Sequence, residues 1–370
     1  MDPQKILLIR LSAIGDILLT TPLLRALRAQ YPQAQLDFVV KSEFAEILRY
    51  HPALNTIYSV NTKNGWPELM TFGRRLFETD YDVIFDIHKN FRSRYLVQAA
   101  RPQRVLRYRK HVLRRGLLVH TKINLLQNFS PIYQRYLEAA APLQISPQPL
   151  ADGRWLELFL SEQDEREADF AILANHWQPG VPMVALAPGA GYFTKRWPAE
   201  FFGHLAVKLI HQRRQVVVLG GSQDLDLANQ IVQVVASTTG KRNQVINLAG
   251  KLSLLGSAAV VKRCRLLIVN DSGLMHVAEA VGTPLVAIFG STTREFGFFP
   301  HLKTSRVVEN LGLSCRPCSH LGFNECPRGH FRCMREITID KVWNAVQEML
   351  TPQGLQSEVE YPEPNRSAVA

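Results

Sequence analysis

The sequence predicts an α/β protein of two Rossmann-like domains that face each other across a central cleft. Two observations predict this fold. Short, continuous apolar runs alternate with segments whose apolar residues recur at helical spacing, a pattern typical of a parallel sheet covered by helices on both faces. The pattern stops near the middle of the chain and starts again, and 370 residues suit two domains of ordinary size.

The first half of the chain shows the strand–helix pattern three times. Continuous apolar runs at 5–11, 35–41 and 81–87 predict strands. A helix is expected after each strand, the second helix at 43–50 and the third from Phe91.

The second half repeats the same pattern. Strands are expected at 182–188, 213–221, 244–250, 264–271 and 283–290. Helices are expected at 198–212, from Asp224, at 253–262, and in the short segment between the last two strands.

The two halves meet at a segment rich in turn residues. HWQPGVP at 176–182 has two prolines and a glycine, which is typical of a linker. We therefore place the first domain at 1–176, the linker at 177–182 and the second domain at 183–352. The tail at 353–370 lacks apolar periodicity and is expected to fray.

The composition is that of a basic globular protein. The 43 lysines and arginines exceed the 32 aspartates and glutamates, which gives a formal charge of +11, and 46% of the residues are hydrophobic. These values exclude disordered and collagen-like classes. Neither a signal-peptide core nor a run of about 18 apolar residues occurs, so we expect a cytoplasmic protein that at most contacts a membrane surface.

The most informative motif is the strand–turn–helix–strand segment at 266–291. Its first strand ends at Asp271, and Ser272 and Gly273 open the following helix. A helix N-terminus exposes N–H groups and favours anions, so this turn predicts a diphosphate site with His276 one turn along. Alternatively, Asp271 or Ser272 only caps the helix, and the histidine is structural.

A second motif carries two cations on a glycine-rich loop. The segment at 186–207 places Lys195 and Arg196 after a strand and before a helix that begins near Pro198. Such a loop can hold a phosphate. The alternative is a pair of ordinary surface charges.

A third motif, LGGSQDLD at 219–226, joins a strand to a helix. Its acidic residues could bind a nucleoside ribose. Alternatively, Asp224 and Asp226 are there only because carboxylates at a helix N-terminus interact favourably with the helix dipole.

The fourth motif places a carboxylate at the first strand–helix turn. Asp16 lies at the carboxyl end of the first strand, where ligands of open α/β sheets bind. It could accept a proton from a hydroxyl group. Its alternative role is that of a helix cap or a first-turn charge.

Several motifs are missing from the sequence. It contains neither the P-loop pattern nor G-x-G-x-x-G after the first strand, so P-loop nucleotide hydrolysis and ordinary dinucleotide-dependent dehydrogenation are not supported. It also lacks H-E-x-x-H, and no catalytic metal is indicated.

A basic tract follows the strands of the first domain. It could bind nucleic acid, an anionic membrane or a phosphorylated acceptor, or it could be an ordinary solvated surface. Its members are Arg92, Arg94, Arg101, Arg104, Arg107, Arg109, Lys110, Arg114 and Arg115.

Four of the five cysteines cluster near the end of the chain. Cys315, Cys318, Cys326 and Cys333, with two histidines between them, are the ligand types of a structural zinc site. Their spacing is irregular, so reduced thiols and transient disulfides remain alternatives.

Taken together, the motifs resemble the lipopolysaccharide heptosyltransferases of glycosyltransferase family 9, especially the heptosyltransferase II branch. The resemblance is carried by the SAIGD turn, the PGAGYFTKRWP loop, the LGGSQD turn and, most specifically, NDSGLMHVAEAVGTPLVAIFG. It extends over roughly residues 5–350 in the same order.

On the donor side, the resemblance implies the glycosyltransferase B fold and an inverting transfer from ADP-L-glycero-β-D-manno-heptose. Lys195 would neutralise the donor phosphates with Thr194 beside it, and Gly221 and Asp224 would approach the adenosine. The implied diphosphate turn comprises Asp271, Ser272, Gly273, Leu274, Met275 and His276. No cofactor is required for this reaction.

On the acceptor side, the resemblance implies an inner-core lipopolysaccharide acceptor, Kdo- or heptosyl-lipid A. Asp16 would be the general base, and Asn90, Arg92 and Ser93 would contact the acceptor. The basic tract would then meet anionic lipid A at the inner leaflet of the cytoplasmic membrane, which implies peripheral association and no nucleic-acid partner.

Two other classes of function compete with this interpretation. One is another nucleotide-sugar transferase, or an epimerase, of the same fold. The other is a polyanion-binding protein without catalysis, which the +11 charge supports.

Overall fold

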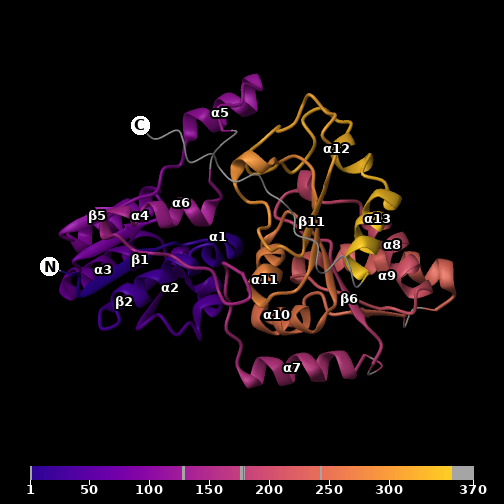
Figure 1. Cartoon of the computed structure of the whole chain (residues 1–370), viewed down its shortest axis with the longest axis horizontal. Helices are drawn as coiled ribbons and strands as arrows, with labels where there is room; N and C mark the ends of the chain where they lie inside the picture. Colours follow the sequence, from indigo (N-terminus) through magenta and orange to yellow (C-terminus); the bar gives the residue numbers. More distant parts are fainter. Residues whose placement is uncertain (1, 127–129, 176–177, 179, 242–243, 352–370) are drawn as a thin grey trace. The chain divides into compact units, whose positions relative to one another are not determined.

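The computed structural model describes residues 2–126, 130–175, 178, 180–241 and 244–351 (Figure 1). The chain divides into two compact units, and each contains one parallel sheet. The N-terminal unit comprises Met1–Lys110 and Ile132–Phe159, and the C-terminal unit comprises His111–Pro131 and Leu160–Ala370. The predicted α/β class with two Rossmann-like sheets is confirmed.

The N-terminal unit is built on a five-stranded sheet in the order β3-β2-β1-β4-β5. Its strands are β1 (Lys5–Ile9), β2 (Gln35–Lys41), β3 (Thr56–Val60), β4 (Val83–Asp86) and β5 (Arg104–Leu106). Its helices are α1 (Ile14–Leu18), α2 (Thr21–Gln30), α3 (Gly65–Thr79), α4 (Phe91–Ala100) and α6 (Ile132–Glu138), with the 3₁₀ turns η1 (Ser42–Leu48), η2 (Thr62–Asn64) and η3 (Ala141–Leu143). Because all neighbouring strands are parallel, the loops after β1 and β4 emerge at the same edge.

The C-terminal unit has a six-stranded sheet in the order β11-β10-β9-β6-β7-β8. Its strands are β6 (Met183–Ala187), β7 (Gln215–Val218), β8 (Val245–Asn247), β9 (Leu266–Asn270), β10 (Leu285–Phe289) and β11 (Ser305–Glu309). Its helices are α5 (Val112–Thr121), α7 (Glu162–Leu173), α8 (Ala199–His211), α9 (Leu225–Thr239), α10 (Leu254–Arg263), α11 (Gly273–Val281), α12 (Arg332–Arg335) and α13 (Ile339–Leu350), with the 3₁₀ turns η4 (Phe193–Lys195), η5 (Ser222–Asp224) and η7 (Arg294–Phe296).

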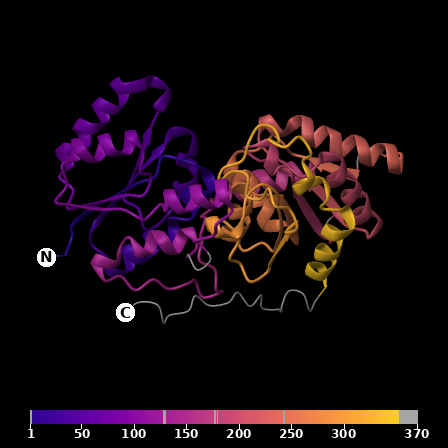
Figure 2. The same cartoon turned by 90° about the horizontal axis from the view of Figure 1, so that it is seen from above.

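Helices cover this second sheet on both faces, as its continuous apolar strands require. Along β6, Val184 and Leu186 join one buried cluster, whereas Met183, Ala185 and Ala187 join another. These alternate side chains point to opposite faces because a strand has a period of two. The last helix, α13, packs beside α8 on one face, as two views at right angles show (Figures 1 and 2).

The sequence missed three strands, misassigned one helix and did not predict several helices, among them α3, α7 and α13. The edge strand β3 is only partly buried, β5 has three residues, and β11 mixes buried with half-buried positions, so none forms a continuous apolar run. The helix expected at 43–50 is the 3₁₀ segment η1, in which only Ile47 and Leu48 are buried.

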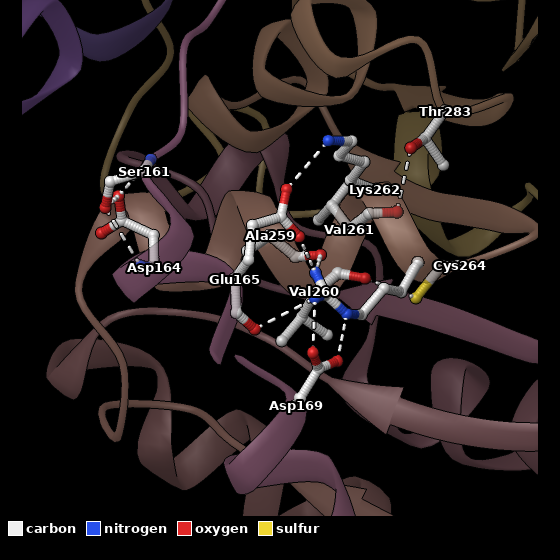
Figure 3. A network of polar contacts seen from close by, with 11 residues as sticks. Ser161, Asp164, Glu165, Asp169, Ala259, Val260, Val261, Lys262, Cys264 and Thr283 are labelled. Carbon is white, nitrogen blue, oxygen red and sulfur yellow. Dashed lines mark hydrogen bonds and ion pairs between the residues drawn. The ribbon is translucent and has the colours of Figure 1, made fainter. Parts of the chain in front are cut away.

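The division between the units differs from the predicted linker at 177–182, because α7 already belongs to the C-terminal unit. Ala168 and Ile172 of α7 pack into the core beneath the second sheet. On the outside, Arg263 of α10 binds the carboxylates of Glu165 and Asp169 (Figure 3). The contacts of α7 therefore move the division to Leu160.

The segment His111–Pro131 is a second departure from the predicted domains. Leu118 of α5 and the following Leu126 pack against Phe296, which lies in the C-terminal unit. A simple cut between two halves of the sequence therefore assigns α5 to the wrong unit. The predicted tail at 353–370 and positions 177 and 179 of the predicted linker lie outside the described residues.

No helix in the described part of the chain is long and apolar enough to cross a lipid bilayer.

The variant R263A tests how α7 is held. Removing the guanidinium breaks its contacts with both carboxylates and with the carbonyls of Glu165 and Ala259, so we expect a loss of about 1 kcal/mol of stability and faster amide exchange in α7. The control R166A removes an exposed pair with Glu162 on the same helix and should have little effect. Equal exchange rates in both variants would show that this network does not hold α7.

Candidate active site

The donor-side residues of the C-terminal unit are centred on a buried ion pair. The Lys195 ammonium lies 2.8 Å from Oδ2 of Asp271, and the Thr292 hydroxyl donates to the same oxygen at 2.7 Å. The Asp271 side chain is 9% exposed. An acceptor-only carboxylate in this position holds the lysine rather than contacting a phosphate itself. We call Lys195, Asp271 and Thr292 the lysine cluster.

Polar contacts from the end of β9 keep the lysine-bearing loop in place. Asn270 is fully buried, and its amide donates to the Pro188 carbonyl at 2.8 Å. Its Oδ1 accepts from the backbone N–H of Trp197 at 3.1 Å. The loop is therefore fixed at both ends of the segment that carries the lysine, and sequence reasoning missed this asparagine.

Helix α11 begins directly after Asp271, as predicted. Ser272 is its N-cap in extended conformation, and no side chain of the described residues caps it. The first-turn N–H groups and the helix dipole therefore favour an anion at this end. Met275 is fully buried in the core and Leu274 packs against it, so neither side chain can serve a ligand. The Met275 N–H donates to the Ser272 carbonyl at 3.2 Å.

Thr194 has a different role from the one expected. It is 1% exposed, its hydroxyl accepts from the Phe323 N–H at 2.8 Å, and its N–H donates to the Phe323 carbonyl at 3.1 Å. At Gly322 the backbone φ is +114°, and a Cβ would lie 2.7 Å from that of Tyr192. Thr194 thus joins two closely packed loops rather than presenting its hydroxyl to a phosphate.

His276 belongs to a buried polar chain on α11. Its Nδ1 lies 2.7 Å from Glu279 Oε2, and the other oxygen of Glu279 accepts from the His301 N–H. Burial lowers the pKa of His301 to about 4, with Glu279 opposing the shift and His276 and Arg294 adding to it. This chain fixes the ring of His276, and neither Glu279 nor His301 was predicted.

The predicted nucleoside residues form a compact turn at the start of α9. Asp224 is 5% exposed, and its Oδ2 accepts from the Gly221 N–H at 3.0 Å. A Cβ on Gly189 would lie 2.4 Å from this carboxyl group, so the glycine is needed for the close approach. Burial raises the pKa of Asp224. Contact with a nucleoside stays a prediction.

In the N-terminal unit, Asp16 lies in the first turn of α1 and is bound on one side only. Its Oδ1 lies 2.6 Å from the Arg10 guanidinium and accepts from the Tyr136 hydroxyl at 3.3 Å. Burial alone would lower the pKa of Arg10, but Asp16 and neighbouring groups raise it above its usual value. No side chain of the described residues binds Oδ2, which is the atom left to take a proton.

His88 was not predicted, although it lies beside this pair. Burial, Arg10 and Lys110 lower its pKa to about 4, against the opposing charges of Asp16 and Asp86. Lys110 donates to the His88 carbonyl at 2.6 Å, and Arg10 donates to the Ile87 carbonyl at 3.0 Å. The imidazole is therefore neutral at pH 7. The sequence offered only a basic segment here, and burial is what distinguishes this histidine.

Two of the three predicted acceptor residues cap α4 instead. The Asn90 side chain accepts from the Ser93 N–H at 2.9 Å, and the Ser93 hydroxyl accepts from the Asn90 N–H at 3.0 Å. Ser93 is fully buried and bonded within this reciprocal capping box, which also occupies Oδ1 of the half-buried Asn90. Arg92 is exposed and could still contact an acceptor.

The cysteine cluster does not form a metal site in the described residues. All five cysteines are free, and no three potential ligands in the described ranges converge on one point. Burial and nearby thiols raise the pKa of Cys318, and burial raises that of Cys333 to about 12. These directions describe the thiols without a metal, and zinc binding would itself deprotonate them, so the zinc site stays a prediction from the sequence.

Comparison with known families gives this geometry its context. The profile of glycosyltransferase family 9 (heptosyltransferase) matches residues 69–325. The chain belongs to this family. The predicted family and activity class, a glycosyltransferase, are thereby confirmed.

Two relatives are similar to this family 9 chain along most or all of their lengths. Lipopolysaccharide heptosyltransferase 2 of Salmonella typhimurium is 27% identical over 95% of this chain and 100% of its own length. The same-named protein of Escherichia coli is 30% identical over 79% of this chain and 84% of its own. A solved structure of the E. coli ADP-heptose heptosyltransferase II, 27% identical, covers 94% of this chain and 98% of its own at a TM-score of 0.72.

A family 9 structure from Veillonella parvula matches with a TM-score of 0.76 over 96% of this chain and 98% of its own. At 22% identity it supports the fold alone.

The buried chain at α11 makes the stability of the protein pH-dependent. The pKa of His301 is about 4 in the folded protein against 6.5 as the ordinary value, so between these values the unfolded state binds more protons. Stability is therefore lost as the pH falls from 6.5 towards 4. We expect H301Q to lose less stability than the parent between pH 7 and about pH 5, measured by urea unfolding.

The control H204Q removes an exposed histidine of α8. An identical change of pH dependence in H204Q and H301Q would contradict the role of the buried ring.

Proposed function

We propose that this chain transfers heptose from ADP-L-glycero-β-D-manno-heptose, with inversion, to the inner core of lipopolysaccharide on Kdo- or heptosyl-lipid A. The observation that carries the proposal is the lysine cluster at the N-terminus of α11, a built cationic site for a diphosphate. The relatives named as heptosyltransferases and the E. coli ADP-heptose enzyme support the identity of the donor.

The C-terminal unit is assigned to the donor. Lysine has three donors, and Asp271 takes one of them at 2.8 Å, which leaves two for phosphate oxygens. The open N–H groups of α11 add further donors beside the same point. These groups stabilise the negative charge on the leaving ADP, which is the role that a divalent metal would otherwise fill. We therefore propose a reaction without a catalytic metal or another cofactor.

The N-terminal unit is assigned to the acceptor and to the proton. In one displacement, the acceptor oxygen forms a bond to the anomeric carbon as the bond to the diphosphate breaks, and the electron pair leaves with ADP. The acceptor proton passes to Oδ2 of Asp16, while Arg10 holds Oδ1. A single displacement inverts the anomeric centre.

The acceptor is lipid-linked, so the proposed place of work is the cytoplasmic face of the inner membrane, with peripheral association and no nucleic-acid partner. The diphosphate site suits other nucleotide sugars equally well, and the similarity to the E. coli ADP-heptose enzyme is what favours ADP-heptose over them. A non-catalytic polyanion binder gains no support from the site. A polyanion binder has no need for an oriented Asp16 or for the lysine cluster.

The direct test supplies the purified chain with ADP-heptose and Kdo-lipid A, with or without a first heptose. We expect one heptose to be added and ADP to be released, measured by mass spectrometry. Transfer from UDP-sugars in place of ADP-heptose would overturn the proposal.

The variant D16N should separate chemistry from donor binding. The amide cannot take the proton, so we expect the turnover rate to fall by at least about 100-fold. Affinity for ADP, measured by calorimetry, should stay unchanged because the donor is assigned to the other unit. The control D340N alters an exposed first-turn aspartate of α13 and should change neither quantity. Full turnover in D16N would exclude Asp16 as the base.

The variant K195A should weaken donor binding and turnover together. It removes the cation but leaves the Asp271 carboxylate beside the diphosphate, so we expect ADP affinity to fall by more than about tenfold. The double variant K195A/D271N also removes the Asp271 charge that K195A leaves unpaired. A fold disturbed by that unpaired charge should therefore recover in the double variant, whereas ADP binding should stay weak. Unchanged ADP affinity in both variants would remove Lys195 from the donor site.

A further inference from the structure

Helix α3 of the N-terminal unit carries an exposed apolar face. Trp66, Met70 and Phe77 are 45%, 49% and 53% exposed. Their spacings of four and seven residues place them on one side of the helix, and the adjacent side, with Leu69 and Leu76, is buried. The helix is therefore apolar on both its core side and part of its outer side.

Helix α4 extends this apolar face. The two helices pack side by side (Figure 1), and Gly73 permits the close approach, because a Cβ there would lie 2.9 Å from that of Ala99. Phe91, at the start of α4, is 74% exposed. Its ring centroid lies 5.4 Å from that of Trp66 in an edge-to-face contact. We call Trp66, Met70, Phe77 and Phe91 the α3–α4 patch.

Arginines border the patch. Exposed Arg74 follows Met70 by four residues on the same side of α3, and the Arg101 guanidinium lies 5.6 Å from the Phe77 ring centroid. Helices α3 and α4 together carry four arginines against two glutamates. One of these glutamates, Glu68, accepts a hydrogen bond from Asn64. The surface thus combines exposed rings with an excess of positive charge.

We propose that the α3–α4 patch docks the N-terminal unit on an anionic lipid bilayer. Indole and phenyl rings lie favourably at headgroup depth, and arginines at the border pair with anionic headgroups. Complementary charge distinguishes this occupant from an uncharged lipid surface. The choice of a bilayer over an acidic protein rests on the proposed function, which puts the acceptor in a membrane.

The mode of binding follows from the same residues. Four exposed apolar side chains on two short helices give shallow, reversible insertion, and the arginines add an attraction that salt weakens. The Trp66 ring of α3 contacts the rings of Phe91 and Tyr95 of α4, with centroids 5.4 Å apart in both pairs. These contacts fix the two helices relative to each other. The patch thereby orients the unit instead of merely attracting it to the membrane.

The experiment measures co-sedimentation of the full-length chain with phosphatidylcholine vesicles that contain or lack phosphatidylglycerol, at low and high salt. The expected result is binding that requires the anionic lipid and weakens with salt. We expect W66Q/F91Q to lose binding by on the order of tenfold or more, and R74Q/R101Q by about tenfold. Equal binding to both kinds of vesicle, or no binding at all, would overturn the proposal.

Matched controls locate the effect. F170Q removes a phenylalanine that is 76% exposed, as Phe91 is 74%, but that lies on α7, a helix with an acidic first turn. K251Q removes an exposed lysine elsewhere. Both should bind vesicles like the parent. L113Q removes a leucine of α5 that is 88% exposed. Loss of binding in L113Q with full binding in the patch variants would assign docking to α5 and overturn the proposal.

A second measurement separates this inference from the proposed function. With a water-soluble acceptor fragment freed of its acyl chains, the W66Q/F91Q variant should transfer heptose at the parent rate, because it alters membrane docking alone. An equal loss on soluble and membrane-bound acceptors would indicate a structural role and overturn the proposal. If the parent transfers no heptose to the soluble acceptor, the proposed function fails. The vesicle-binding measurement still tests whether the α3–α4 patch docks on a membrane.

Discussion

The ion pair between Lys195 and Asp271 is the interaction on which the proposed donor site depends. A carboxylate alone at the start of α11 would repel a diphosphate, and a lysine alone on a glycine-rich loop would be free to point into solvent. Joined at 2.8 Å, with Thr292 on the same oxygen, they give an oriented ammonium whose other donors remain for a ligand. Asn270 and Thr194 hold the loop that carries the lysine through hydrogen bonds to the Pro188 carbonyl and from the Phe323 N–H. These contacts therefore help to position the ion pair.

The N-terminal unit uses an ion pair for a different purpose. Arg10 binds one oxygen of Asp16 and leaves the other accessible, which orients the carboxylate without neutralising its capacity to accept a proton. Around it, burial and the cations of Arg10 and Lys110 keep His88 neutral. The cations of Arg10 and Lys110 thus lie near Asp16, the proposed base. They favour its ionised carboxylate and would also attract an anionic acceptor.

Much of the fold could be read from the sequence because parallel strands buried on both faces form continuous apolar runs, as β6 and β9 do. Edge strands such as β3 lack that signal, and the unit boundary was wrong because α7 is assigned by its contacts with Arg263 and the core rather than by proline and glycine content. Motif position predicted the start of α11, which the structure confirms, whereas the roles of Asp16 and Lys195 stay predictions. It could not show that Thr194 binds the backbone of Phe323, because that partner is distant in sequence, or that Glu279 is buried beside His276.

The central claim is that the C-terminal unit binds an adenosine diphosphate through its own cation and helix N-terminus. The most direct measurement is calorimetric binding of ADP, UDP and GDP to the purified chain, with Mg²⁺ and with a chelator. The account predicts preference for ADP and equal affinity with and without the metal. Preference for UDP, dependence on Mg²⁺, or absence of nucleotide binding would contradict it.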